Sequence, residues 1–390
     1  MNVRVIFEAV AWLVALSWVY KLVEAWFGLP RVPDLLEGKF DRLPEGMPSL
    51  AVIVPARNEA EDVAACLGSL VAQDYPELKV IAVDDRSTDG TGRIMDELAA
   101  AHPERLRVLH VSELPQDWLG KTHAMALAAA QCDAEWLLFT DGDVLFRADS
   151  LRRALAFAVE SDADHLVTVP TTMIERWDEG ALLGFFQIFG LWVARPWKIA
   201  DPRARRDAIG IGAFNMVRRS AYEQIGGFEA LRMEIVEDIG LGRRIKRAGL
   251  RQRIAFGRGL VRLHWASGAL GLVEVMTKNM FSAFRFYVSL ALVACLWLMV
   301  FCVAPVFGLL MRGTRLPAAI TLIAIAGVYW LYGRISGISA WQVLLSPFAA
   351  MLFLYTLLRS MVTTLRQGGV IWRGTFYSLK TLRRYAAPLF

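Results

Sequence analysis

Short apolar runs alternate along the chain with longer stretches whose apolar residues recur at helical spacing. The short runs predict buried strands, because they are brief, apolar and bounded by turn residues. Strands are expected at Leu50–Val54, Val80–Val83, Leu106–Val111, Trp136–Thr140 and His165–Val169, and helices at, for example, Ala60–Ala72, Thr91–Ala101 and His123–Ala130. This alternation predicts an α/β fold with a mostly parallel sheet covered by helices.

A long apolar stretch precedes this region. Residues 5–27 are mostly apolar, with Glu8, Lys21 and Glu24 as charged interruptions, and we interpret residues 1–29 as a membrane anchor. Because of Glu8, an amphipathic helix lying on the membrane surface is the alternative. The proline-rich residues 30–48 read as a linker.

More apolar segments follow the α/β region. Residues 271–286 are expected to form an interfacial amphipathic helix. The range 287–358 holds three apolar segments, at 287–311, 316–333 and 340–358. Each can span about 30 Å of hydrocarbon, although the length of the second is marginal. Three complete spans would place the basic tail, residues 359–390, opposite the α/β domain, whereas basic tails favour the cytoplasmic side. A re-entrant or interfacial segment would reconcile the two, and the sequence leaves open which segment that is.

Charge divides the chain in the same way as hydropathy. Hydrophobic residues make up 55% of the chain, and its mean hydropathy is +0.39. All 38 acidic residues lie at or before Glu274, and eleven of the 43 basic residues follow it. The net charge of +5 therefore combines −6 before that point with +11 after it, which indicates a lipid-facing portion and not a nucleic-acid-binding protein. The four cysteines form no CxxC pair, so no disulfide framework or zinc site is implied.

The most informative stretch is Trp136–Val144, in which a short apolar strand ends abruptly at Asp141-Gly142-Asp143. Two carboxylates at the end of a buried strand are costly to desolvate unless a cation lies beside them. Magnesium or manganese bridging to phosphate oxygens would be such a cation. The alternative is an ordinary strand-to-turn junction with two solvated aspartates.

Polar residues also follow the first two strands, at residues 55–59 and 84–91. Ligands bind at the carboxyl ends of strands in such sheets, so these residues are expected near a ligand. Lys121 opens a helix, where a cation opposes the helix dipole, so we expect it to face an anion. Glu237-Asp238 is predicted to head a helix; a capping role is the alternative there.

These motifs, taken in order, resemble the family 2 inverting glycosyltransferases of GT-A fold. The resemblance covers about residues 49–257, and the expected GT-A domain spans 49–270. The matching stretches are residues 54–59, 83–91, 120–121, 140–143, 210–219, 226–228 and 237–238. Together with the apolar segments, they look most like the membrane-bound bacterial branch associated with hopanoid and carotenoid glycosylation. Ceramide glucosyltransferases are more distant relatives.

The resemblance implies a role for each matching residue on the donor side. The residues that would bind the nucleotide sugar, expected to be UDP-linked, are Pro55, Ala56, Arg57, Glu59, Asp84, Asp85, Lys121 and Asp141. Asp141 and Asp143 would hold Mg²⁺ or Mn²⁺ on the diphosphate. Asp238 would be the general base that deprotonates the acceptor hydroxyl for an inverting displacement.

On the acceptor side the resemblance implies Gly212, Ala213, Phe214, Glu237 and Arg285. The stretch Ala208–Arg219 reads as a strand of small residues, which would leave room for a substrate or allow tight backbone packing. One motif departs from the family: the Gln-x-x-Arg-Trp of its polymer synthases does not follow the acidic pair. This departure disfavours a processive synthase.

The interpretation is therefore a metal-dependent inverting glycosyltransferase that moves a sugar onto a membrane lipid. It would lie in the inner (plasma) membrane as a multi-pass protein with its catalytic domain in the cytoplasm. The alternatives are a processive exopolysaccharide synthase and a non-catalytic membrane scaffold of the same fold.

Overall fold

The structure is a computed structural model that describes residues 3–385, and the chain forms two compact units. The sheet unit comprises Val32–Met173, Lys198–His264 and the segment that begins at Thr381. The helical unit comprises the chain up to Arg31, Ile174–Trp197 and Trp265–Lys380. Residues 174–197 fall inside the range expected for the α/β domain, but they belong with the apolar helices.

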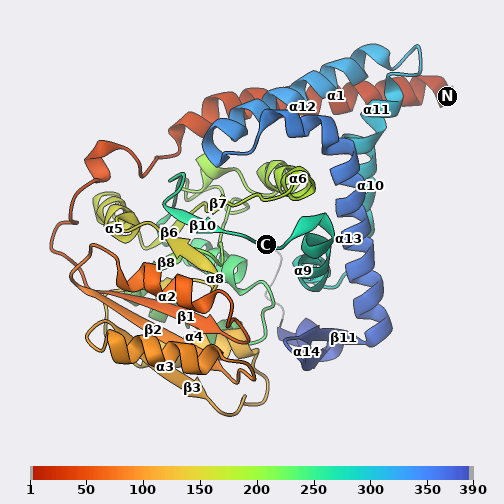
Figure 1. Ribbon diagram of the computed structural model, residues 1–390. Coiled ribbons are helices and arrows are strands. Elements are labelled where there is room, and N and C mark those ends of the chain that lie inside the picture. Colours follow the sequence, from red (N-terminus) through yellow and green to blue (C-terminus); the bar gives the residue numbers. More distant parts are fainter. Residues whose placement is uncertain (1–2, 386–390) are drawn as a thin grey trace. The chain divides into compact units, whose positions relative to one another are not determined.

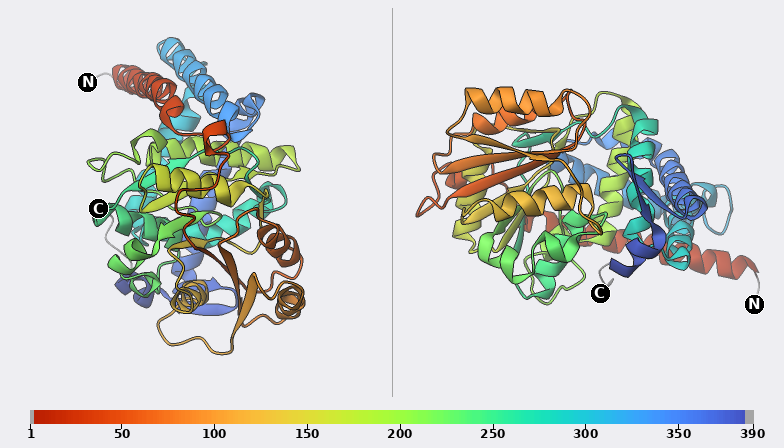
Figure 2. Two further views of the ribbon diagram at one scale, coloured as in Figure 1. Left: turned by 90° about the vertical axis from the view of Figure 1, so that its left-hand side faces the viewer. Right: turned by 90° about the horizontal axis from the view of Figure 1, so that it is seen from below.

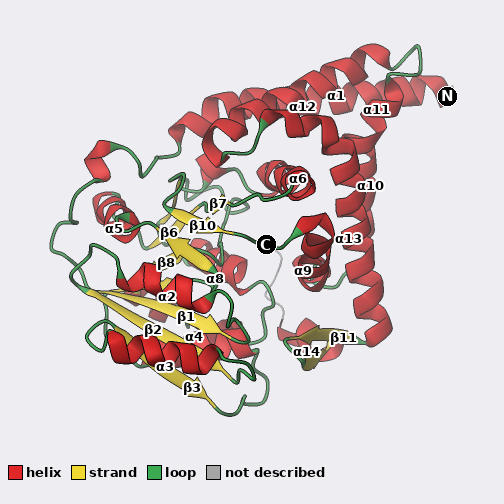
Figure 3. Ribbon diagram, viewed as in Figure 1, coloured by secondary structure: helices red, strands yellow, loops and turns green. Residues whose placement is uncertain are grey.

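A seven-stranded sheet forms the centre of the sheet unit, in the order β3-β2-β1-β4-β8-β6-β9 (Figure 3). The first four strands in this order are parallel, β8 is antiparallel to both of its neighbours, and β6 pairs with β9 in parallel. The strands are β1 (Leu50–Ala56), β2 (Leu78–Asp85), β3 (Leu106–Val111), β4 (Trp136–Phe139), β6 (His165–Thr168), β8 (Asn215–Arg218) and β9 (Gln252–Ala255). The predicted α/β fold with a mostly parallel sheet is confirmed.

Helices cover both faces of this sheet (Figure 1). Alternate residues of β1 enter different cores: Val52 packs with residues of α2, α3 and α5, whereas Ile53 packs with residues of α4, α7 and α8. This is the period of two expected of a strand buried on both faces. The helices are α2 (Val63–Val71), α3 (Thr91–Ala101), α5 (Ser150–Glu160), α4 (Gly120–Ala130), α7 (Arg219–Gln224) and α8 (Glu237–Arg247).

A second, three-stranded sheet continues directly from the end of β4. It consists of β5 (Val144–Phe146), β10 (Val261–Leu263) and β7 (Thr171–Thr172), in the order β5-β10-β7. Asp141-Gly142-Asp143 is therefore the turn that joins the two sheets. Its backbone is held from both ends by strands, which fixes the direction of the two carboxylates.

The strand expected at Ala208–Arg219 is wrong in its first half. Only Asn215–Arg218 forms β8, and residues 208–214 form a loop that lies against the start of α8. A Cβ at Gly210 would overlap the carbonyl oxygen of Asp238, and a Cβ at Gly242 would overlap that of Ile209. Gly210 therefore serves close backbone packing between the loop and α8.

The helical unit contains four helices long and apolar enough to cross a membrane, counted over residues 3–385: Val3–Arg31, Val288–Gly308, Arg315–Ser336 and Ala340–Gln367. The first is α1 (Val3–Gly28) with its 3₁₀ extension, and the second consists of α10 (Val288–Leu298), a π-helical turn and α11 (Ala304–Gly308). The third is α12 (Arg315–Ser336). The fourth is α13 (Ser346–Gln367) together with the 3₁₀ turn before it. The unit also contains the helices α6 (Trp177–Val193) and α9 (Gly268–Ala283). Helices α1 and α12 lie side by side (Figures 1 and 2).

The C-terminal region has more structure than the expected tail of residues 359–390. Helix α13 continues to Gln367 and ends at Gly368, which has a φ of +67°. A hairpin of β11 (Gly369–Trp372) and β12 (Thr375–Ser378) follows, and then α14 (Leu379–Tyr385). Residues 386–390 of the expected tail lie outside the described part of the chain. The range expected for the amphipathic helix, 271–286, corresponds to α9, which begins three residues earlier.

Candidate active site

The loops after β1 and β2 lie next to each other at the carboxyl edge of the sheet, since Ala56 pairs with Asp84. They are bound together by their own polar residues. Asn58 accepts the backbone N–H of Thr88 at 2.8 Å through its side chain, and its own N–H donates to Ser87 Oγ at 3.1 Å. Asp89 accepts the N–H of Ala60. These motif residues therefore hold the shape of the two loops, a role that the sequence analysis did not assign to them.

Asp84 and Asp85, the predicted nucleotide contacts, occupy different surroundings. Asp84 accepts the Ser87 N–H at 3.0 Å and lies 3.1 Å from Nδ1 of His110. Hydrogen bonding to Asp84 raises the pKa of His110. Asp85 is buried and pairs with Arg86 at 2.8 Å. Asp85 thus already binds a neighbouring cation, and Asp84 lies at the more open position.

Lys121 lies in the first turn of α4 and bridges two carboxylates. Its Nζ lies 2.6 Å from Asp141 Oδ1 and 2.6 Å from Glu237 Oε1. Burial disfavours the charged ammonium, but the two carboxylates outweigh it and raise the pKa of Lys121. The expected anion beside Lys121 is thus present in this structure as a pair of side chains, and Lys121 links the turn after β4 to the start of α8.

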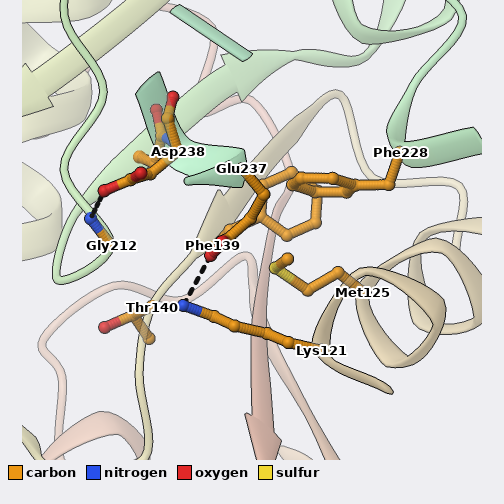
Figure 4. Close-up of a pocket in the computed structure, with 9 residues that line it drawn as sticks. Lys121, Met125, Phe139, Thr140, Gly212, Phe228, Glu237 and Asp238 are labelled. Atoms are coloured by element: carbon orange, nitrogen blue, oxygen red, sulfur yellow. Dashed lines mark hydrogen bonds and ion pairs between the residues drawn. The ribbon is translucent and has the colours of Figure 1, made fainter. Parts of the chain in front are cut away.

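Asp238 lies in the first turn of α8, as predicted. Its Oδ2 accepts the backbone N–H of Gly212 at 2.9 Å (Figure 4). Its Oδ1 accepts the N–H of Ile239 at 2.7 Å. Burial and the neighbouring Glu237 carboxylate raise the pKa of Asp238 to about 7, against the opposing charge of Lys121. A carboxylate with these properties is fixed in direction and ready to accept a proton near neutral pH.

Asp141 and Asp143 form the turn between the two sheets. Burial raises the pKa of Asp143 to about 7, and the charges of Asp141 and Glu59 add to this effect. Among residues 3–385, no group of three or more His, Cys, Asp or Glu side chains is placed to hold a metal by itself. Two hard oxygen donors in a strongly negative surrounding fit Mg²⁺ or Mn²⁺ that also binds the oxygens of a phosphate ligand.

A small pocket lies beside these charged groups (Figure 4). Its apolar wall consists of Met125, Phe139 and Phe228, and its polar wall includes Lys121 and Asp238. The remaining lining residues are Thr140, Gly212, Asn215 and Glu237. Thr140 donates to the carbonyl oxygen of Ala213 at 2.8 Å, which ties the end of β4 to the loop before β8.

The residues expected on the acceptor side occupy different surroundings. Gly212 lies between the two acidic groups, because a Cβ there would be 2.7 Å from Asp141 Oδ2 while its N–H binds Asp238. Ala213 is buried, and Phe214 is fully buried in the core shared with α2 and α5. Arg285 belongs to the helical unit, just after α9.

The donor-side residues lie together more closely. Pro55 and Ala56 end β1, and Ala56 approaches the turn, since a Cβ at Gly142 would lie 3.3 Å from that of Ala56. Arg57 and Glu59 follow in the same loop, and the charge of Glu59 acts on Asp143. His123 packs edge-on against Trp118, and burial lowers its pKa.

Known proteins resemble this chain in sequence and in fold. Residues 51–226 match the profile of the family described as glycosyl transferase family 2. The chain is a glycosyltransferase with a glycosyltransferase family 2 domain at residues 51–226. A similar curated protein is the 4,4'-diaponeurosporenoate glycosyltransferase of Staphylococcus aureus, 24% identical over 342 residues, which cover 85% of this chain and 88% of the relative.

Among solved structures, the chain resembles the mannosyltransferase PcManGT from Pyrobaculum calidifontis, which was determined in complex with GDP-Man and Mn²⁺. The TM-score is 0.55 at 20% identity, and the match covers 93% of this chain and 99% of that one. This similarity establishes the GT-A fold.

Proposed function

We propose that the protein is a metal-dependent, inverting glycosyltransferase that moves a sugar from a nucleotide sugar to a membrane lipid. The observation that carries this proposal is the arrangement around Gly212. Its N–H holds the carboxylate of Asp238, and its α-carbon faces Asp141 of the turn between the sheets. A proton acceptor and a pair of oxygen ligands for a cation are thus separated by one glycine.

Asp238 would act as the general base. The acceptor hydroxyl would give its proton to Asp238 as its oxygen bonds to the anomeric carbon, and the bond to the nucleoside diphosphate would break on the opposite face. This single displacement inverts the configuration. The pKa of Asp238, raised to about 7, matches proton transfer near neutral pH.

Asp141 and Asp143 would hold Mg²⁺ or Mn²⁺. When bound, the cation would neutralise charge that develops on the leaving diphosphate. Lys121 would keep Asp141 and Glu237 in place through its two ion pairs. Arg57, Glu59 and Asp84 would line the nucleotide, and the hydrogen bonds between the two loops would keep those side chains in position. The nucleotide is expected to be UDP-linked.

Two observations support a lipid acceptor. The similar Staphylococcus aureus protein is named for transfer to 4,4'-diaponeurosporenoate. The chain itself contains four helices apolar enough to cross a membrane, within the residues that the structure describes. A multi-pass protein of the inner (plasma) membrane with a cytoplasmic catalytic domain would receive both a soluble donor and a membrane-embedded acceptor.

The proposal can be tested in membranes that contain the protein, with a panel of UDP- and GDP-linked sugars and extracted bacterial lipids. We expect one labelled sugar to appear on a lipid, and both excess chelator and Asp143→Asn to abolish the transfer. Full activity in excess chelator would contradict the metal role, and a ladder of products would indicate the processive alternative. Release of free sugar without a glycolipid, across all lipids tried, would contradict a lipid acceptor.

A further inference from the structure

Three polar side chains lie in the interior of the sheet unit on neighbouring strands. His165 of β6 is 0% exposed, Asn215 of β8 is 2% exposed, and Gln252 of β9 is 1% exposed. His165 is paired with Gln252 between the parallel strands β6 and β9, and with Val217 between the antiparallel strands β6 and β8. Asn215 lies two residues before Val217 on β8, so its side chain points to the same face as that of Val217. All three side chains therefore lie on the same face of the sheet. It is the face that α8 covers, because Val217 belongs to the core that residues of α8 share.

Hydrogen bonds join the three side chains into one chain. Gln252 Nε2 donates to His165 Nδ1 at 2.9 Å, and His165 Nε2 bonds to Asn215 Oδ1. An amide nitrogen can only donate, so Nδ1 accepts and Nε2 carries the proton. Burial lowers the pKa of His165 to about 4, which keeps the ring neutral and this order of donors unchanged at neutral pH.

This network reaches Asp238 along two routes. Asn215 Nδ2 lies 3.5 Å from the carbonyl oxygen of Asp238. Gln252 binds both backbone groups of Ile209: its Oε1 accepts the N–H at 3.2 Å, and its Nε2 donates to the carbonyl oxygen at 2.9 Å. Ile209 lies three residues before Gly212, whose N–H holds the carboxylate of Asp238.

We propose that Gln252, His165 and Asn215 are positioning residues for Asp238, an inference that rests on the base role given to Asp238 above. Gln252 holds the loop that supplies the Gly212 N–H, Asn215 holds the backbone of Asp238, and His165 fixes both amides relative to each other. The network thereby sets the direction of the carboxylate toward the acceptor.

The cost of burial supports this role. Burying polar groups is unfavourable unless every group is paired, and apolar side chains would fill the same face of the sheet at lower cost. His165 and Gln252 are 87 positions apart in sequence. Their hydrogen bond therefore joins two strands that only the tertiary structure brings together. A displacement of about 1 Å in a reacting group can lower the rate by about 100-fold, which gives a fixed loop a large effect on turnover.

The test compares two buried glutamines. Gln73 is 2% exposed and is also fully bonded, to Ser69, Arg147, Ser150 and Leu151, with no bond to the loop or to α8. We expect Gln252→Leu and Gln73→Leu to lower the thermal stability similarly. Per folded molecule, Gln252→Leu should lower kcat by about 10-fold or more with an almost unchanged donor KM, whereas Gln73→Leu should keep wild-type kcat.

A second pair of variants covers the case in which Gln252→Leu does not fold. His165→Gln offers an amide N–H toward Asn215 and should retain more turnover than His165→Phe, at equal donor KM. If Gln252→Leu keeps wild-type kcat, or if His165→Gln and His165→Phe turn over equally, the network is structural and the inference is wrong. If the inference fails in this way but Asp238→Asn loses transfer, the proposed function still stands. If the wild-type protein itself transfers no sugar, the proposed function and this inference are both wrong.

Discussion

The side chain of Asp238 combines two properties that normally oppose each other. Two backbone N–H groups hold its oxygens, which favours the ionised form, while burial and Glu237 favour the protonated form and raise its pKa to about 7. The ionised carboxylate is therefore available at neutral pH, and its affinity for a proton is high enough to take one from a hydroxyl. This balance leads to a prediction about pH.

Transfer should rise with pH through a midpoint near 7 and level off above it, because only the ionised Asp238 can accept the proton. In Glu237→Gln the midpoint should move to lower pH, since the charge that helps to raise the pKa of Asp238 is gone. The pH profile of kcat at saturating metal measures this, because a bound cation keeps Asp143 ionised. A midpoint that stays in place in Glu237→Gln would contradict the electrostatic coupling.

The positions of single residues were partly predictable from the sequence. The placement of Asp141 and Asp143 after a strand, and of Asp238 at the start of a helix, was visible in the local pattern. The bridge that Lys121 makes between Asp141 and Glu237 could not be predicted, because it joins three segments far apart in sequence. His165, Asn215 and Gln252 carry no local signal of a shared role, because they lie on three different strands and no strand was predicted at Gln252.

The elements themselves were predicted best where their pattern is local. The strand expected at Leu106–Val111 and the helix expected at Thr91–Ala101 have the predicted bounds. The strand expected at Ala208–Arg219 is half loop, because the backbone of residues 208–214 packs against α8, a contact with no trace in the sequence pattern. The hairpin after α13 was missed because basic residues there suggested a solvated tail.

Close packing between this loop and α8 leads to a second prediction. Gly210→Ala should lower the free energy of unfolding by about 1–3 kcal/mol and reduce transfer sharply, since its Cβ would push against the carbonyl of Asp238. Gly68→Ala is the control: no atom lies within 4 Å of its added Cβ, so the better helix former should stabilise α2 by about 0.5–1 kcal/mol. Thermal unfolding and the transfer rate measure both, and equal behaviour of the two variants would refute this account of the loop.

At the scale of the whole molecule, the C-terminus returns to the sheet unit. The hydroxyl of Tyr385 donates to Asp117 at 3.2 Å and accepts from Arg232 at 3.0 Å, and the guanidinium of Arg232 also lies over the Tyr385 ring. The carbonyl of Arg232 in turn accepts the N–H of Leu119, just before α4. Tyr385 is thus tied to the segments that lead into α4 and α8, which carry Lys121 and Asp238.

This contact leads to a third prediction, about membrane topology. The chain leaves the sheet unit after His264 and returns at Thr381. With the sheet unit on one side of the membrane, we expect an even number of crossings in between. One of the three C-terminal candidate spans therefore should not cross. With the native cysteines replaced, Arg384→Cys and Glu97→Cys should react with an impermeant thiol reagent from the same side. Labelling from opposite sides would contradict the attachment of Tyr385.

The most direct test of the whole account is the comparison of Asp238→Asn with Glu237→Gln. We predict that Asp238→Asn keeps the fold and the affinity for the nucleotide sugar but loses about 10²–10⁴-fold or more in transfer, the usual contribution of a general base. Glu237→Gln should lose less, because Glu237 acts through Lys121. The measurement is the transfer rate together with nucleotide affinity, for both variants in the same membrane preparation. Near-normal transfer by Asp238→Asn, or a loss in proportion to donor affinity, would contradict the assignment of the base.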